Sequence, residues 1–325
     1  MTGQLSLGLI GVRGFVGREV LRLVAGHPTL KLVFASSRDL AGQPVSTLAS
    51  KAGDLTIEAL TPQPAAKRKA DIIVLGLPNG LAAPFVAALE EHCPNSLIID
   101  LSADYRFTNG WAYGLPELYA DKQALASTRR IANPGCYATM AQLAIFPALE
   151  KIGLGQPPSI FAVSGYSGAG TTPGPMNDLD NLADNLIPYQ LTGHLHEQEI
   201  AYHLGHEVRF TPHVHPAFSG LLVSVHLRFK TQISRDQLID LYREIYRSHD
   251  LIQVQDAPPT LKDSIGQPGA ILGGFEMTQD GYGAVIVSVG DNLLKGAAVQ
   301  AVQNINIASG FAPLLGLLGL AGSNS

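Results

Sequence analysis

The residues best suited to chemistry surround a single cysteine, Cys136, in the stretch 133–139 (NPGCYAT). Pro134 and Gly135 favour a turn, and the apolar residues 138–149 favour a buried helix. Cys136 is therefore expected at a helix N-terminus. Unpaired backbone N–H groups and the helix dipole stabilise a thiolate there, which lowers the thiol pKa from its free value of roughly 8.5. This placement predicts a nucleophile; the alternative is a small buried hydrophobic residue.

Histidines crowd one stretch of the chain and are candidates for the proton transfer that a cysteine nucleophile needs. They are His194, His196, His203, His206, His213 and His215. Proton transfer near neutral pH requires a pKa near 7, which histidine supplies. His194 and His196 precede an amphipathic pattern, so at least one can project into a cleft. We expect no metal site, because no cysteine accompanies the histidines and the nearby acidic residues lack a metal-ligand spacing.

The start of the chain predicts a dinucleotide-binding site. An apolar strand at 5–10 leads into a glycine turn at 11–17 (GVRGFVG) and then a helix at 18–25. Such glycines let the backbone approach a pyrophosphate at the helix N-terminus, although an ordinary tight turn is the alternative. The candidate cofactor-binding residues are Gly11, Arg13, Gly14, Phe15, Val16 and Gly17.

The next predicted strand, 30–35, indicates which dinucleotide binds. It ends in Ser36, Ser37 and Arg38, with no acidic residue at its end to bind a ribose 2'-hydroxyl. Hydroxyls followed by an arginine suit a 2'-phosphate, so we expect NADP in preference to NAD. The alternative for Arg38 is a solvated loop residue.

Two further strands, 71–77 and 96–101, are almost continuously apolar, which is typical of a parallel sheet covered on both faces. A helix is predicted between them at 81–91. Arg106 follows the second strand at the carboxyl edge, where doubly wound folds bind ligands. It could clamp an anionic substrate group, or form a structural ion pair with a neighbouring aspartate, Asp104 or Asp100.

The second half of the chain predicts an α+β domain with a mixed sheet. A strand at 159–164 leads into a glycine-serine loop, 165–170, able to present backbone N–H groups to an oxyanion or phosphate. Residues 171–189 are rich in Pro and Asx and predict a long, functional loop. Further strands are expected at 221–229, 270–275 and 284–289, a helix capped by Ser234 and Gln237 through 246, and a last helix at 292–309.

The composition limits which partners and which cellular location are expected for the protein. A chain of 325 residues with 46% hydrophobic residues can form two domains. A net charge of −5 without a basic run argues against nucleic acid and anionic membranes as partners. Two cysteines suit a reducing compartment, the first residues show no signal peptide, and the longest apolar run, 311–321, is shorter than the roughly 20 residues that span a bilayer. We therefore expect a cytoplasmic protein.

Eight motifs, in order from residue 5 to about 310, resemble the N-acetyl-gamma-glutamyl-phosphate reductase family. They are 11–17, 102–107 (SADYRF), 113–118 (YGLPEL), 133–139, 167–170 (SGAG), 194–196 (HLH), 210–213 (FTPH) and 291–298 (DNLLKGAA). This family shares its fold with aspartate-semialdehyde dehydrogenase and, more distantly, glyceraldehyde-3-phosphate dehydrogenase. The resemblance implies an NADP-binding domain at 1–137, to which a helix at about 292–310 returns, a catalytic and dimerisation domain at 138–291, and an apolar tail at 311–325.

The resemblance also implies an activity in arginine biosynthesis. N-acetylglutamyl 5-phosphate is reduced by NADPH to the 5-semialdehyde, through a cysteine thioester and with release of inorganic phosphate. The family's nucleophile falls on Cys136 and its acid/base on His194, with His196 as the second candidate. The implied substrate ligands are Arg106, Ser167 and Gly168, and Asn292 lies near the nicotinamide. Family members are homo-oligomers, usually dimers or tetramers.

Departures from the family pattern keep other readings open. Leu195, Gln198 and Thr171 replace residues that many members carry. Aspartyl phosphate or a carrier-bound aminoadipyl phosphate therefore remain possible substrates. Two alternatives come from other classes of protein. A cysteine hydrolase or acyltransferase that uses no cofactor would fail to bind NADPH. A non-catalytic NADP sensor would have an unreactive Cys136 thiol.

Overall fold

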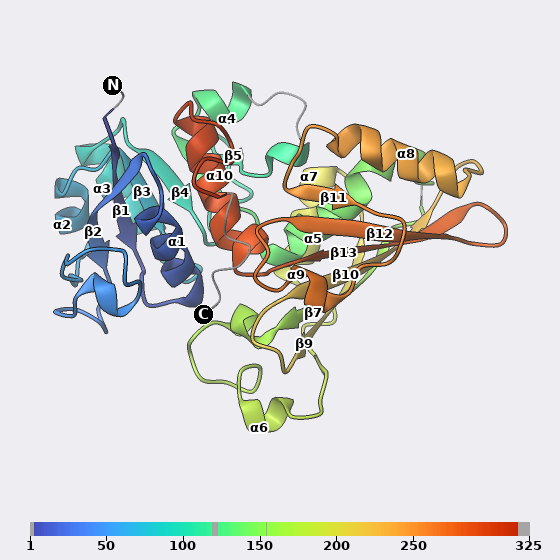
Figure 1. Cartoon of the computed structure of the whole chain (residues 1–325), viewed down its shortest axis with the longest axis horizontal. Helices are drawn as coiled ribbons and strands as arrows, with labels where there is room; N and C mark the ends of the chain where they lie inside the picture. Colours follow the sequence, from blue (N-terminus) through green and yellow to red (C-terminus); the bar gives the residue numbers. More distant parts are fainter. Residues whose placement is uncertain (1–2, 119–122, 154, 318–325) are drawn as a thin grey trace. The chain divides into compact units, whose positions relative to one another are not determined.

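A computed structural model describes residues 3–118, 123–153 and 155–317 (Figure 1). The chain divides into two compact units. The first contains the described residues up to Gly135 and those from Ala297 onward, and the second is Cys136–Gly296. Among the described residues, no helix is both long and apolar enough to cross a membrane.

The described residues of the first unit form a six-stranded parallel sheet in the order β2-β1-β3-β4-β6-β5. Its strands are β1 (Leu5–Ile10), β2 (Leu30–Ser36), β3 (Ile72–Leu75), β4 (Leu97–Asp100), β5 (Ala112–Tyr113) and β6 (Arg130–Ala132). Every residue of β3 and β4 is buried, as expected for a sheet covered on both faces. The predicted run 71–77 nevertheless gives a shorter strand, because the chain leaves the sheet at Gly76.

Helices cover both faces of this sheet (Figure 1). They are α1 (Phe15–Ala25), α2 (Pro62–Lys67), α3 (Ala83–His92), α4 (Gln123–Ser127) and α10 (Val299–Ala308), with short 3-10 turns η1 (Val45–Thr47) and η2 (Pro116–Leu118). The helices α2 and α3 pack together over Ile73 and Leu75 of β3. Helix α10 contacts α1 and β4, so a segment from the end of the chain completes the first unit.

In the described residues, the second unit contains a seven-stranded sheet in the order β11-β12-β13-β10-β7-β9-β8. Its strands are β7 (Ser159–Gly165), β8 (Ile187–Pro188), β9 (Arg209–His215), β10 (Leu221–Arg228), β11 (Ile252–Val254), β12 (Ala270–Met277) and β13 (Gly283–Gly290). The pairs β7·β9 and β11·β12 are parallel and the other pairs antiparallel. The sheet is therefore mixed, and the two units confirm the predicted fold class.

Helices pack on one face of the mixed sheet. The unit contains α5 (Cys136–Ile145), α6 (Leu179–Leu182), α7 (Leu195–Leu204), α8 (Arg235–Tyr246) and α9 (Leu261–Ser264), with the 3-10 segments η3 (Phe146–Lys151) and η4 (Tyr166–Ala169). The π-helical turn η5 (Leu294–Ala298) begins in this unit, and its last two residues belong to the first. Every residue of α5 after Cys136 is buried, and α5 contacts β10 and β13. The hydroxyl of Tyr246 donates to the Leu143 carbonyl at 2.7 Å, which ties α8 to α5. The predicted capping box of α8, Ser234 with Gln237, is confirmed.

Three regions differ from the sequence expectation. The predicted loop 171–189 contains α6 and β8, and Asn177 holds it by donating to Gly170 O and Thr172 O at 3.0 and 2.8 Å. Strand β9 was not predicted, because Pro212 lies inside it and proline is rare in strand interiors. The predicted helix 292–309 begins as the π-helical turn η5 and becomes α-helical at Val299.

The apolar tail predicted at 311–325 is described as far as Leu317, and residues 318–325 lie outside the described part of the chain. Leu317 is buried. The side-chain amide of Asn306 donates to Pro313 O and Leu315 O at 3.1 and 2.9 Å. The described part of the tail therefore packs on α10.

Candidate active site

The glycine turn of the first unit brings backbone segments too close together for side chains. Gly11 has φ +97°, and a Cβ built on it would lie 2.1 Å from the Gly76 carbonyl oxygen. A Cβ on Gly17 would lie 2.3 Å from the Gly11 carbonyl oxygen. These two glycines therefore allow the tight turn after β1 and the close packing of α1 against it.

The start of α1 suits an anion. The helix begins at Phe15, three residues earlier than the sequence indicated, with Gly14 as N-cap. No side chain of the described residues caps the first turn, and a Cβ on Gly14 would meet no described atom within 4 Å. The first turn, which includes Phe15 and Val16, therefore leaves room for a pyrophosphate at the helix N-terminus.

Strand order places this turn where doubly wound sheets bind ligands. β1 lies between β2 and β3, so the chain connections diverge on the two sides of β1. Gly11 and Gly76 follow β1 and β3 at their carboxyl ends, and Gly76 N–H donates to Ile10 O at 2.7 Å. The residues present therefore fit a dinucleotide at this topological switch point.

The predicted cofactor-binding residues after β2 have different roles in the structure. Ser36 is buried; its hydroxyl accepts from Leu60 N–H at 3.1 Å and its carbonyl from Gly11 N–H at 2.8 Å. It therefore builds the turn. Arg13 pairs with Asp39 at 2.5 Å, an ion pair that the sequence reading missed. Arg38 is exposed, which leaves it able to meet a 2'-phosphate.

Arg106 and Asn133 fix the segment that precedes Cys136. The buried guanidinium of Arg106 donates to Asn133 O and Leu101 O at 3.0 and 3.2 Å. The Asn133 amide donates to Ala297 O at 3.1 Å, and its oxygen accepts from Asn304 at 3.1 Å. These bonds give Arg106 a structural role in the first unit. Its role as a substrate ligand stays a prediction.

Cys136 is the first residue of α5, which confirms its predicted place at a helix N-terminus. Cys136 is half-buried, and neither it nor Cys93, both within the described residues, forms a disulfide. The π-helical turn η5 lies directly against it, since a Cβ on Gly296 would be 2.7 Å from the Cys136 Cβ. Gly296 N–H donates to Asp291 O at 2.9 Å. Glycine at 296 is thus required for Cys136 to keep its place, and nothing local in the sequence revealed this.

His194 is the N-cap of α7, and its protonation is determined by its contacts. Nδ1 accepts from His196 N–H at 3.0 Å, so the proton of the neutral ring lies on Nε2. The side chain is 6% exposed, and burial lowers its pKa while the charge of Glu199 partly opposes this. His194 is therefore neutral near pH 7 and presents an Nε2–H donor.

Two tyrosines that sequence analysis did not single out join Cys136 to the histidines. The ring of Tyr137 lies edge-on to His196 and His194, at 5.6 and 6.4 Å between centroids, and the Tyr189 ring lies 5.5 Å from His194. Burial first, and then the charge of a Cys136 thiolate, raise the pKa of Tyr189. Its position at the end of the predicted functional loop was the only available signal.

Ser167 and Asn292 also meet in the second unit. Ser167 lies in η4, directly after β7, and Asn292 follows β13. The Asn292 amide nitrogen donates to Ser167 Oγ at 2.9 Å. The neighbouring Gly168 is close-packed, since a Cβ there would lie 3.1 Å from Ser164 Oγ.

The remaining histidines lie apart from this cluster. On β9, buried and less buried residues alternate, so His213 and His215 lie on the face opposite to Phe210, which packs against Tyr137 and His194. His203 and His206 lie at the end of α7. In the described ranges, no group of three or more His, Cys, Asp or Glu side chains could hold a metal ion.

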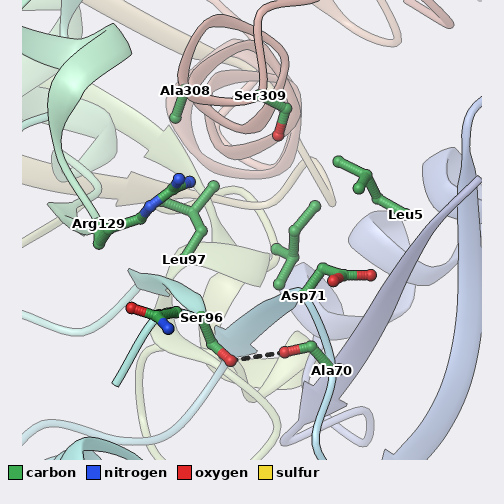
Figure 2. A pocket seen from close by; sticks show the side chains of 10 residues that line it. Leu5, Ala70, Asp71, Ser96, Leu97, Arg129, Ala308 and Ser309 are labelled. Carbon is green, nitrogen blue, oxygen red and sulfur yellow. Dashed lines mark hydrogen bonds between the residues drawn. The ribbon is translucent and has the colours of Figure 1, made fainter. Parts of the chain in front are cut away.

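A hollow of about 390 Å³ lies elsewhere in the first unit (Figure 2). Leu5, Asp71, Leu97 and Arg129 line it at the amino ends of the parallel strands, and Figure 2 shows the Ser96 hydroxyl bonded to Ala70 O beside them. None of the predicted site residues lines this hollow. Because the amino ends of the strands line it, the hollow lies at the sheet edge opposite to the glycine turn.

Comparison with known proteins begins with two domain families. Residues 6–126 match the semialdehyde dehydrogenase NAD binding domain, and residues 136–292 match the semialdehyde dehydrogenase dimerisation domain. Aspartate semialdehyde dehydrogenase II from Vibrio cholerae, solved in complex with ASA, has a TM-score of 0.76 at 19% identity and covers 94% of this chain and 98% of its own. The Candida albicans enzyme, solved with NADP, has a TM-score of 0.73 at 16% identity, covering 94% and 99%. These structures show the fold, and with the domain matches they define a semialdehyde dehydrogenase.

Sequence relatives are more specific. A protein of Xanthomonas campestris pv. campestris (strain 8004) is 48% identical over 307 residues, 94% of this chain and 96% of its own. One of Stenotrophomonas maltophilia (strain R551-3) is 47% identical over 306 residues, 94% and 95%. Both are named N-acetyl-gamma-glutamyl-phosphate reductase. The chain belongs to the N-acetyl-gamma-glutamyl-phosphate reductase family, which confirms the resemblance drawn from its motifs.

Proposed function

We propose that this protein reduces N-acetylglutamyl 5-phosphate with NADPH to N-acetylglutamate 5-semialdehyde and inorganic phosphate, a step of arginine biosynthesis. The observation that carries the proposal is the placement of Cys136 at the first residue of α5, beside the His194 cluster, in a chain 48% identical to a reductase of that name over 94% of its length. The glycine turn of the first unit supports the choice of a dinucleotide-dependent reaction.

In the first half of the reaction, the Cys136 thiolate attacks the acyl carbonyl of the substrate. A carbon–sulfur bond forms, and phosphate leaves with the electron pair of the carbon–oxygen bond. Backbone N–H groups at the start of α5 stabilise the negative oxygen that develops on the carbonyl. The product of this half-reaction is a thioester on Cys136.

The second half reduces that thioester. NADPH, when bound, would supply the hydride that reduces the thioester carbonyl. Collapse of the resulting hemithioacetal breaks the carbon–sulfur bond, releases the aldehyde and returns Cys136 as a thiolate. The neutral His194 ring donates a hydrogen bond from Nε2 to the developing oxyanion, because its Nδ1 is occupied by His196 N–H. His196 is the second candidate for this role.

The cofactor would be held by residues of the first unit. The turn from Gly11 to Gly17 and the first N–H groups of α1 would bind the pyrophosphate, and Ser37 with Arg38 would bind the 2'-phosphate. Equal affinity for NADPH and NADH in a fluorescence titration would contradict the assignment of Arg38. The two thiols suit the reducing cytoplasm, where we place the enzyme.

We infer that the protein is a homo-oligomer, built on a dimer that uses the open face of the mixed sheet. Phe161 of β7 is 40% exposed on this face, and its ring lies tilted against that of His213 of β9, with 4.5 Å between the centroids. The matching domain family is named for dimerisation. Burying these aromatic side chains against a second copy would stabilise the pair.

The decisive experiment measures phosphate-dependent reduction of NADP with purified N-acetylglutamate 5-semialdehyde. Aspartate semialdehyde is tested beside it under the same conditions. We expect turnover with the first substrate and little with the second. Preference for aspartate semialdehyde would reassign the protein to another acyl-phosphate reductase, and turnover without phosphate would contradict the acyl-phosphate mechanism.

A further inference from the structure

The hollow of about 390 Å³ in the first unit has no part in the reaction described above (Figure 2). It lies where β1, β3, β4 and β6 begin, and Ala308 and Ser309 at the end of α10 also line it. Its volume is within the range of small-molecule sites, roughly 300–1000 Å³. The side chains around it therefore determine which ligand it could take.

Arg129 supplies a cation at one side of the hollow. Its guanidinium forms no ion pair or hydrogen bond with any described residue, while its carbonyl accepts from Ile98 N–H at 2.9 Å. The neighbouring Arg130 differs, because its guanidinium donates to Ser96 O at 3.0 Å and pairs with Glu90 at 3.3 Å. The side chain of Arg130 thus anchors the start of the strand, whereas that of Arg129 is exposed and can meet a ligand.

Asp71 supplies an anion two strands away from Arg129. Its Oδ2 accepts from Ser6 N–H at 2.8 Å and from Ser6 Oγ at 2.6 Å, and these bonds, the side-chain bond first, lower the pKa of Asp71. The carboxylate is therefore ionised at neutral pH. No cation of the described residues pairs with it, and no donor among them bonds its Oδ1. Ser6 thus holds the carboxylate in place and leaves one oxygen for a ligand.

Strand order determines how far apart the two charged residues lie. Asp71 precedes β3 and Arg129 precedes β6, and β4 lies between these two strands. Neighbouring strands are about 4.8 Å apart, so the two backbones are separated by roughly 10 Å. Leu97, the first residue of β4, lies between the two charged residues (Figure 2). A ligand that contacts both charges must therefore extend across Leu97.

The wall between the charges is apolar. The apolar side chains that line the hollow are those of Leu5, Ala70, Ile72, Leu97 and Ala308. Two polar groups beside this wall are already bonded: the Ser96 hydroxyl donates to Ala70 O at 2.6 Å, and Leu97 N–H donates to Asp71 O at 2.9 Å. Asn95 and Ser309 complete the lining with uncharged polar side chains. The middle of the hollow therefore suits a hydrocarbon chain.

We propose that this hollow binds a small molecule with a carboxylate at one end and an ammonium group at the other, joined by a short hydrocarbon chain. The Arg129 guanidinium pairs with the carboxylate, and the Asp71 carboxylate pairs with the ammonium group. ω-Amino carboxylates are the simplest members of this class, and amino acids with a basic side chain have the same two ends. The inference goes beyond the proposed function, because none of the residues assigned to the reaction lines the hollow.

The test is a ligand-observed NMR titration of the full-length protein, saturated with NADPH, with 6-aminohexanoate. We expect a Kd on the order of 1 mM. Hexanoate and hexylamine each lack one charge, and the two charges of glycine are too close together to span the hollow. Each of these three compounds should bind at least roughly 10-fold more weakly. Hexanoate or glycine binding as tightly as 6-aminohexanoate would overturn the proposal.

Two variants locate the ligand. Arg129→Gln and Asp71→Asn each remove one charge, and each should weaken the binding of 6-aminohexanoate roughly 10-fold. Arg129→Gln should leave the affinity for hexylamine unchanged, and Asp71→Asn should leave that for hexanoate unchanged. The matched controls are Arg209→Gln and Asp240→Asn, the same changes at exposed residues of the second unit. Wild-type affinity for 6-aminohexanoate in both test variants would place the ligand elsewhere and overturn the proposal.

The test survives the loss of one variant and does not depend on turnover. If Asp71→Asn fails to fold without its bonds to Ser6, Arg129→Gln still decides, because the Arg129 side chain has no partner among the described residues. L-Ornithine and L-lysine identify the member of the class: tighter binding than that of 6-aminohexanoate assigns basic amino acids, and weaker binding assigns ω-amino carboxylates. The affinity for 6-aminohexanoate should be the same within about twofold with and without NADPH, since the hollow lies at the sheet edge opposite to the glycine turn. Competition between the two ligands would place 6-aminohexanoate at the glycine turn and overturn the proposal.

Discussion

The two units build their candidate sites from different parts of the chain. The first unit uses backbone: Gly11 and Gly17 remove side chains from a tight turn, and α1 offers its first N–H groups. The second unit uses side chains, with Cys136, His194 and Ser167 contributed by segments far apart in the sequence. A backbone site depends on local conformation, whereas a side-chain site depends on how several elements pack. Variants in the two units should therefore fail in different ways.

The largest effect is expected for Cys136→Ser. A serine hydroxyl is a far weaker nucleophile than a thiolate at neutral pH, so turnover should fall by roughly 1000-fold or more. The variant keeps the size and place of the side chain at the start of α5. Turnover and NADPH binding are measured in the same preparation. If the first unit binds the cofactor and the second carries the reacting side chains, the NADPH affinity of the variant should equal that of the wild type. Unimpaired turnover would contradict the proposed mechanism.

The matching change in the first unit is Gly11→Ala. A methyl group at φ +97° is strained and would meet the Gly76 carbonyl oxygen at 2.1 Å, so the turn must move. We expect NADPH affinity to fall by roughly 100-fold and the free energy of unfolding by about 2–4 kcal/mol. NADPH titration and urea unfolding measure the two effects.

Gly14→Ala is the control for that variant. Its φ is −63°, and the added methyl meets no described atom within 4 Å. The free energy of unfolding should therefore change by less than about 1 kcal/mol. Equal destabilisation by the two substitutions would show that the contact with Gly76 does not matter.

The contrast between a backbone site and a side-chain site also explains which features the sequence could predict. The Gly11 turn, the buried strands β3 and β4, the capping box of Ser234 and the helix start at Cys136 obey local rules, and all were predicted. The importance of Gly296 and Tyr189 could not be predicted. Gly296 contacts Cys136 and Tyr189 contacts His194, and both contacts exist only in the folded chain. The same applies to the pairing of Arg13 with Asp39.

Strand β9 shows why even an element can be missed. Pro212 and the histidines give a weak strand pattern, yet the segment pairs along its length with β7. Pairing with a neighbouring strand therefore outweighed the local preference. Gly296 illustrates the same limit inside a predicted helix, because the π-helical turn that accommodates Cys136 leaves no signal in hydrophobic periodicity.

A smaller effect distinguishes the two histidines. His194→Ala removes the Nε2–H donor and the cap of α7, so we expect kcat to fall by roughly 100-fold. His196→Ala should cause a milder loss, since the backbone N–H that orders His194 remains. Single-turnover kinetics of both variants, with Cys136 alkylation as a check on the nucleophile, measure this. The reverse order of effects would move the acid/base role to His196.

The smallest effect concerns the pH dependence of unfolding, where the two units again differ. Burial lowers the pKa of His27 in the first unit and of His194 and His215 in the second. The native state then binds fewer protons than the unfolded chain. The free energy of unfolding is therefore undiminished above about pH 6.5 and falls as pH drops towards the lowered values, by at most about 1.4 kcal/mol per histidine and pH unit.

With two such histidines against one, the second unit should lose more stability than the first between pH 7 and 5.5. The only tryptophan, Trp111, lies in the first unit and stacks on Tyr105 at 4.0 Å, so its fluorescence reports urea unfolding there, while circular dichroism reports both units. We expect the acid shift of the circular dichroism transition to exceed that of the fluorescence transition. His194→Gln should reduce the difference, and the same substitution at the exposed His226 should not. Equal acid shifts of both signals in the wild type would mean that the two units unfold in one transition. The contrast between the units would then apply to ligand binding and not to stability.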